Sequence, residues 1–92
     1  MANMKDNKMI LLNIRKLLLE KTDKAHPVTT EGIIHYLNHQ GYEVENRAVI
    51  NDIEILREFG DEIFKLRTMH GYMYYHGSPH DPKVVDFDNI TL

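Results

Sequence analysis

The chain has 92 residues, no cysteine and a formal net charge of −3, and 42% of its residues are hydrophobic. This length fits one domain with a modest core and leaves little room for a deep enzyme cleft, so no enzymatic activity and no cofactor are expected. The absence of cysteine excludes disulfides, thiolate metal sites and cysteine nucleophiles. The longest apolar run, residues 9–12, is far shorter than the roughly 20 residues that span a bilayer. We therefore expect a cytoplasmic protein without a membrane partner.

Apolar residues at helical spacing predict a first helix over about residues 6–22. Ile10, Ile14, Leu17 and Leu18 form one stripe of an amphipathic helix, and basic residues occupy much of the opposite face. Residues 1–24 carry six basic and three acidic groups, whereas residues 25–60 carry two basic and six acidic groups. Because a DNA-binding domain usually gathers positive charge on one face, this uneven balance bears directly on function.

A second helix is predicted for the stretch EGIIHYLNHQ. Thr29 or Thr30 is a good N-cap for it, and Gly41 is a natural stop after it. Gly32 in its first turn weakens the helix by about 1 kcal/mol relative to alanine. Pro27 pushes the residue before it toward an extended conformation.

A third helix is predicted from about Asn46 to Phe59, ended by Gly60. The residues spaced to face the core are Val49, Ile53, Leu56 and Phe59. With the second helix and the short connection between them, this helix has the order of a helix-turn-helix.

After Gly60 the apolar period changes from 3.6 to 2. The stretches EIFKLR and YMYYH alternate as two strands of a β-hairpin, with TMHG as the turn and the tyrosines packing the hairpin. The last stretch, GSPHDPKVVDFDNITL, reads as a linker and tail that could add an edge strand. The expected fold is α+β and mostly α, a winged helix-turn-helix of three helices and a two-stranded wing over residues 1–76, with a tail over residues 77–92.

Three stretches carry a resemblance to a known family: HPVTTEGIIHYL, GYEVENRAVINDIEILREFG and the wing ending in HGYMYY. Together they resemble the N-terminal winged helix-turn-helix of WYL-domain, DeoR-like bacterial transcriptional regulators. In those regulators the third helix opens with a hydroxyl cap and two basic residues, followed by Thr, an apolar residue, Tyr and Arg. Here the corresponding stretch reads ENRAVIN, and only Arg47 keeps its charge. The downstream WYL effector domain has no counterpart in these 92 residues.

The resemblance implies a DNA-binding transcriptional regulator, or the DNA-binding module of one, with the third helix in the major groove. The exposed early residues of that helix would contact base edges, and they are Asn46, Arg47, Ile50 and Asn51. Asparagine can pair with adenine, arginine with guanine, and isoleucine can touch a thymine methyl. A homodimer on paired half-sites is expected, with the first helix and the VVDFDNITL tail as candidate dimer elements.

Phosphate contacts are expected from three places. The start of the second helix offers backbone N–H groups and a favourable dipole, and basic residues lie near the start of the first helix and on the wing. These candidates are Thr29, Thr30, Lys5, Lys8, Lys65, Arg67 and His70.

Acidic residues on the third helix motivate a second hypothesis. We expect Asp52, Glu54 and Glu58 to lie on the flank and back of the helix, with Asp52 able to pair with a basic group of the first or second helix. Even so, the acidic balance and the exposed Ile50 also suit a winged helix that binds another protein, with weak or no DNA binding. His35 and His39 have a metal-compatible spacing without an accompanying carboxylate motif, so no metal site is expected.

Overall fold

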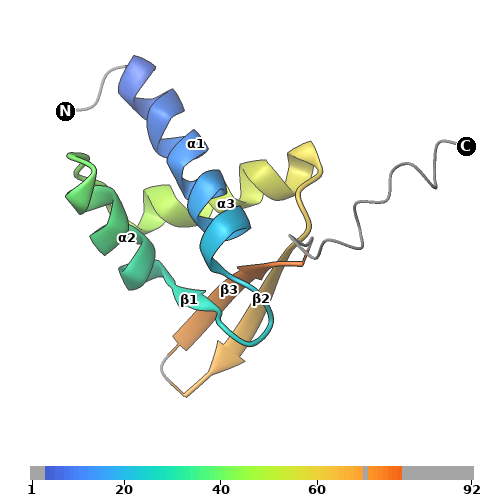
Figure 1. Cartoon of the computed structure of the whole chain (residues 1–92). Coiled ribbons are helices and arrows are strands. Elements are labelled where there is room, and N and C mark those ends of the chain that lie inside the picture. The colour runs from blue at the N-terminus through green and yellow to red at the C-terminus, as the bar shows by residue number, and fades with distance from the viewer. Residues whose placement is uncertain (1–3, 70, 78–92) are drawn as a thin grey trace, which may run out of the picture.

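The computed structural model describes residues 4–69 and 71–77 (Figure 1). Its elements are α1 (Met4–Lys21), β1 (Val28–Thr29), α2 (Thr30–His39), α3 (Asn46–Phe59), β2 (Ile63–Thr68) and β3 (Gly71–His76). The three helices pack together, and a small antiparallel sheet closes the core at the end where α1 finishes (Figure 1). Across these residues, no helix has both the length and the apolarity needed to cross a membrane. His70 and the tail beyond residue 77, which includes the expected edge strand, lie outside the described residues.

The first helix begins two residues earlier than expected and ends one residue earlier. Its predicted stripe is confirmed, because Ile10, Ile14, Leu17 and Leu18 are all buried in the core. Thr22, just after the helix, is also buried, and its hydroxyl donates to the Leu18 carbonyl at 2.6 Å.

The second helix is capped by Thr29, which decides between the two threonines. The Thr29 hydroxyl accepts a hydrogen bond from the N–H of Gly32 at 3.0 Å. Gly32 has a structural reason as well, because a β-carbon at this position would lie 2.9 Å from Cγ2 of Val28. The glycine that weakens the helix therefore allows the preceding extended segment to pass close to it.

The third helix has the predicted bounds and ends at Gly60, whose φ of +128° favours glycine. Val49, Ile53 and Leu56 are buried as predicted. The expectation that Phe59 faces the core is wrong, because this side chain is 77% exposed. Phe59 lies two turns after Asp52 and shares its flank of the helix rather than the core side.

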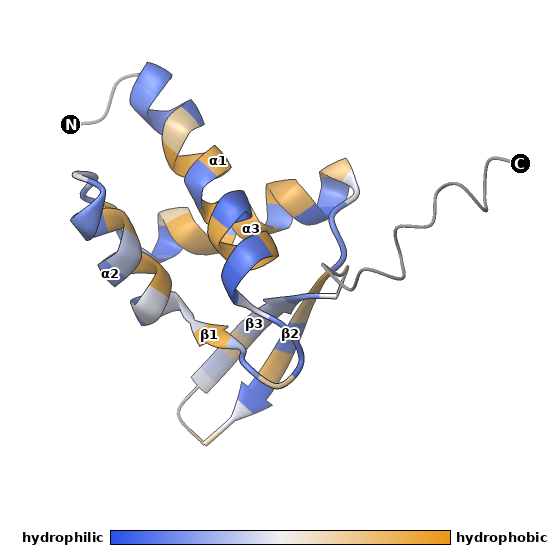
Figure 2. Ribbon diagram, viewed as in Figure 1, coloured by the Kyte–Doolittle hydropathy of each residue, from blue (hydrophilic) through white to orange (hydrophobic). Residues whose placement is uncertain are grey.

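The wing has three strands, not the predicted two. The strand order is β1-β3-β2, with β3 antiparallel to both neighbours. The short strand β1 directly precedes α2, and Val28 pairs with Tyr74. A two-residue strand has no periodicity of its own, so only its pairing with β3 reveals it. Figure 2 shows apolar residues in all three helices and along β2, interrupted by hydrophilic ones.

The two faces of the sheet differ in what covers them. Ile63, Tyr74 and His76 are buried on the face that meets the helices. Directly opposed residues of paired strands share a face, so Phe64 with Tyr75 and Leu66 with Met73 occupy the other face. This second face is called the outer sheet face below.

A polar junction joins α1 to the end of the sheet where β2 begins and β3 ends. Arg15 donates to both carboxylate oxygens of Asp61, from Nε at 2.7 Å and from Nη2 at 3.1 Å. The Nε2 atom of His76 lies 3.5 Å from Oδ1 of Asp61. The backbone N–H of His76 donates to the hydroxyl of Thr22 at 2.9 Å. These four residues (Arg15, Thr22, Asp61 and His76) are called the polar junction.

Candidate nucleic-acid interface

The starts of α2 and α3 and the tip of the wing together line a hollow of about 230 Å³. Its lining contains four residues selected from the sequence, namely Thr29, Thr30, Asn46 and Ile50. The other lining residues are Glu31, Gly71, Tyr72 and Tyr74. Two expected phosphate-contacting residues and two expected base-contacting residues therefore share one surface, which is called the wing-tip hollow below.

The α2 end of the wing-tip hollow is less favourable to phosphate than the sequence suggests. The Thr29 hydroxyl already accepts the N–H of Gly32, so that donor is occupied by the cap. Glu31 is exposed in the first turn and lines the same hollow. A carboxylate beside the helix N-terminus satisfies the dipole itself and would repel a phosphate.

Lys65, Arg67 and Tyr72 lie together on the side of the wing that faces the hollow. Arg67 is paired across the hairpin with Tyr72, and the ammonium of Lys65 lies 4.2 Å from the centre of the Tyr72 ring. Tyr72 therefore packs on a side chain of the wing, as expected, but it is also 45% exposed. Tyr74 is buried in the core and Tyr75 stacks on Phe64 at 5.1 Å between ring centres, as packing residues do. Strand alternation could have placed Tyr72 beside the basic residues once the hairpin register was known.

On the outward side of α3, residues expected to contact bases and acidic residues lie on the same face. Positions three and four apart share a face of a helix. One exposed stripe of α3 consists of Arg47, Asn51, Glu54 and Glu58. The expectation that Glu54 and Glu58 lie on the flank and back is therefore wrong, and the stripe has one positive and two negative charges. Only Asp52 lies on the flank.

The charge of Glu54 also acts on Tyr74 of β3. Burial and the negative charge of Glu54 raise the pKa of Tyr74, while Arg57 lowers it. Arg57 donates to Glu54 at 3.1 Å, so part of the carboxylate's charge is balanced locally. An exposed pair of this kind contributes little to stability, but it partly balances the negative charge of Glu54 on α3.

Lys5 and Lys8 are not brought to the wing-tip hollow. They are exposed in the first turns of α1, whereas the other end of this helix approaches the sheet (Figure 1). The rise of an α-helix separates its two ends by about 25 Å. Phosphate contacts from these lysines would therefore fall on a different part of a duplex from contacts made by the wing.

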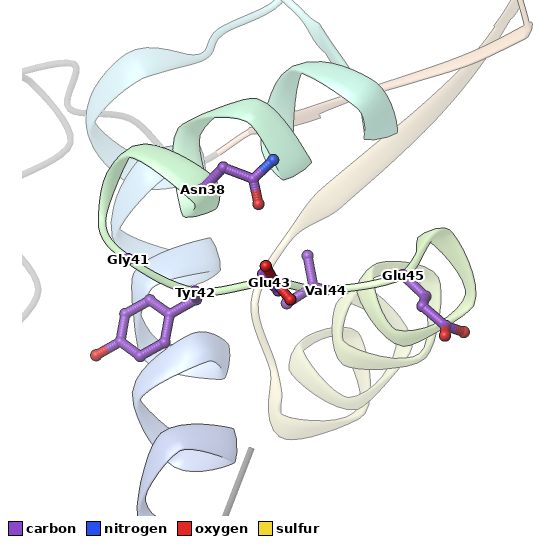
Figure 3. Close-up of a pocket in the computed structure, with 6 residues that line it drawn as sticks. All are labelled: Asn38, Gly41, Tyr42, Glu43, Val44 and Glu45. Atoms are coloured by element: carbon purple, nitrogen blue, oxygen red, sulfur yellow. The ribbon is translucent and has the colours of Figure 1, made fainter. Parts of the chain in front are cut away.

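A second, acidic surface lies along the connection from α2 to α3. Figure 3 shows Asn38, Gly41, Tyr42, Glu43, Val44 and Glu45 around a hollow of about 680 Å³. Glu43 and Glu45 also line a smaller hollow of about 340 Å³ with Asp52 of α3 and Asn7 of α1. Burial raises the pKa of Asp52. Among the described residues Asp52 has no ion pair, so the expected pairing with α1 or α2 is wrong.

The two candidate metal-binding histidines pack against each other. The rings of His35 and His39 are 4.8 Å apart in an edge-to-face arrangement on the exposed side of α2. Within residues 4–69 and 71–77, no group of three or more histidine or carboxylate side chains is placed to hold a metal ion.

Comparisons of the chain with models of protein families, with curated proteins and with solved structures found no match.

Proposed function

We propose that this chain is a winged helix-turn-helix DNA-binding protein, a transcriptional regulator or the DNA-binding module of one. The start of α3 would enter the major groove, with Asn46, Arg47 and Asn51 reading base edges and Ile50 touching a thymine methyl. Lys65 and Arg67 of the wing would hold phosphates, and the exposed Tyr72 would lie against the backbone beside them. The membership in the DeoR-like regulators, the cytoplasmic location and a homodimeric state belong to the same proposal.

One observation supports this proposal above the others. Residues chosen from the sequence at two separate helix starts, Thr29 and Thr30 on one and Asn46 and Ile50 on the other, line a single hollow beside the wing. A duplex that lies across this surface would meet the recognition helix, a helix N-terminus and basic wing residues at once.

An alternative function is supported by the charges. Glu31 lines the wing-tip hollow, and Glu54 and Glu58 share the outward stripe of α3 with Arg47. The apolar Ile55 and Phe59 are 48% and 77% exposed on the same helix. This combination of acidic and apolar surface suits a protein partner with basic residues better than a phosphate backbone.

A single titration separates the two functions. A labelled mixed-sequence duplex is titrated with the full chain at about 50 and about 200 mM salt, and fluorescence anisotropy reports binding. Phosphate contacts release counterions, so DNA binding would weaken by roughly 100-fold over this range if about four contacts form. Absence of binding at the lower salt concentration contradicts nonspecific DNA affinity and favours the protein-binding alternative.

A pair of matched variants shows which surface of the protein contacts DNA. Replacing Lys65 and Arg67 together by glutamine removes two charges from the wing, and replacing Lys16 and Lys21 by glutamine removes two charges from α1. The wing variant is expected to lose affinity and to show a shallower salt dependence, because two phosphate contacts are gone. Equal losses in the two variants would contradict the proposed orientation on DNA.

A further inference from the structure

The outer sheet face is largely apolar, and its side chains lie outside the core that the helices form. Four of its side chains are Phe64, Leu66, Met73 and Tyr75, none of them charged. Phe64 is 43% exposed, and the other three are partly buried. The helices cover only the opposite face, where Ile63 and Tyr74 join the core. Glu62, two residues before Phe64, adds one exposed carboxylate at the border of this face. An apolar face without positive charge has no role in the DNA contacts proposed above, because a phosphate backbone needs positive charge.

The chain leaves the sheet at the border of this face. The N–H of Gly77 donates to the carbonyl of Glu62 at 2.7 Å, which continues the pairing of β3 with the start of β2. A β-carbon at position 77 would collide with the ring of Phe64. The backbone of Gly77 therefore runs directly against the most exposed side chain of the outer sheet face.

The sequence that follows contains a segment suited to cover an apolar surface. Residues 84–92, VVDFDNITL, include five apolar side chains, while residues 78–83, SPHDPK, are polar and contain two prolines. Six linking residues span up to about 20 Å, which matches the length of a six-residue strand. The apolar segment can therefore reach any part of the outer sheet face from Gly77.

We propose that residues 84–92 dock on the outer sheet face of their own chain, with Phe87 and Val85 packed against Phe64, Leu66, Met73 and Tyr75. The size of the face favours this occupant over a second copy. A standard stable interface buries about 800 Å² on each partner, and four side chains that are mostly half-buried offer much less. A tethered segment needs less area, because its effective concentration reaches the millimolar range through a short linker.

The lack of native cysteine allows a direct test on the full chain. Asp88→Cys provides one attachment point for a nitroxide spin label, and amide resonances of the ¹⁵N-labelled protein report which residues lie near it. The amides of Phe64, Leu66, Met73 and Tyr75 are expected to lose at least half of their intensity. Those of Lys5, Lys8 and Lys16 on α1 are expected to be unchanged.

Two further samples show whether a loss of amide intensity over the sheet comes from docking of residues 84–92 of the same chain. Adding Phe87→Asp to the labelled chain should restore the intensities over the sheet, because a carboxylate cannot be buried on this face without cost. Dispersed amide resonances show that the variant is still folded. Unchanged intensities over the sheet in the first sample would overturn the proposal. The second sample mixes a ¹⁵N chain that carries no spin label with a spin-labelled ¹⁴N chain. Loss of amide intensity over the sheet of the ¹⁵N chain would also overturn the proposal, because the segment on the outer sheet face would then come from a second copy.

Discussion

The polar junction and the wing-tip hollow lie at opposite ends of β3 and use polar side chains in contrasting ways. In the polar junction, Asp61 is contacted by both Arg15 and His76, and its side chain is only 7% exposed. In the wing-tip hollow, Asn46 and Ile50 are exposed, and only the Thr29 hydroxyl is engaged in a cap. Polar groups that satisfy one another stabilise the fold, whereas exposed groups that converge around a hollow remain available to a ligand. Substitutions in the polar junction should therefore lower the stability of the fold, whereas substitutions around the wing-tip hollow should change binding and leave stability unchanged.

The largest expected effect is that of Asp61→Ala on stability. The change removes the acceptor of two hydrogen bonds from Arg15 and the contact with His76. We expect the free energy of unfolding to fall by about 2 kcal/mol, because hydrogen bonds between charged groups are lost, while Arg15, whose side chain is 39% exposed, is then solvated by water. Denaturant titration followed by circular dichroism measures this change. Glu58→Ala, on the exposed stripe of α3, is the matched control. If Glu58→Ala lowers the free energy of unfolding as much as Asp61→Ala, the polar junction has no special role in stability.

Acid should weaken the same junction. Burial alone would raise the pKa of Asp61, but the hydrogen bonds and charge of Arg15, helped by His76, hold the pKa below its usual value. The folded state therefore binds fewer protons than the unfolded state, and this stabilisation is complete above about pH 5 and is lost as pH falls below about 4. Unfolding measured from pH 7 to pH 3 should show a stability gap between the wild type and Asp61→Asn that narrows in acid. A gap that stays constant would show that the carboxylate's charge contributes nothing.

At the other end of β3, Arg47→Ala tests binding without a cost in stability. Arg47 is exposed at the start of α3, and the loss of a bidentate contact to guanine costs about 1–3 kcal/mol of specific DNA affinity. The measurement is the dissociation constant for a selected duplex, with thermal unfolding recorded alongside. Lys16→Ala removes the same charge from the outward side of α1 and should leave the affinity nearly unchanged. Equal affinities for wild type and Arg47→Ala would remove this residue from the interface.

The smallest expected effect is on nonspecific DNA affinity, and it tests whether acidic charge on α3 weakens DNA binding. Glu58→Gln removes one negative charge from the stripe that also holds Arg47 and Asn51. Nonspecific DNA affinity at about 50 mM salt should rise by roughly two- to fourfold, since an exposed charge acts weakly and is screened by salt. Glu20→Gln on α1 is the control. If both changes have the same effect, net charge alone is responsible rather than the position of Glu58.

Much of the helical architecture could be predicted because its signals are local. The bounds of α3 and the buried stripe of α1 follow from apolar spacing, and Gly60 ends its helix through a conformation that other residues avoid. Phe59 was misplaced because periodicity defines a face only to within a broad arc. Phe59, three residues after the buried Leu56, lies past the edge of that arc on the flank.

The site was harder to predict than the fold. The residues of the two helix starts were identified from the order of elements, but Glu31 and Tyr72 join them only through the packing of α2 and the register of the hairpin. The position of Glu54 and Glu58 on the stripe of Arg47 could have been read from helix spacing alone.

The three helices, the N-cap chemistry of α2 and the glycine stop of α3 follow from the amino-acid sequence alone, because they depend on residues a few positions apart. Tertiary structure decided what depends on distant segments. It added β1 as a third strand against β3 and explained Gly32 by the approach of Val28. It also brought Arg15 to Asp61, 46 positions away. Local spacing fixes which residues share a face of one element, but only packing decides which faces of different elements meet.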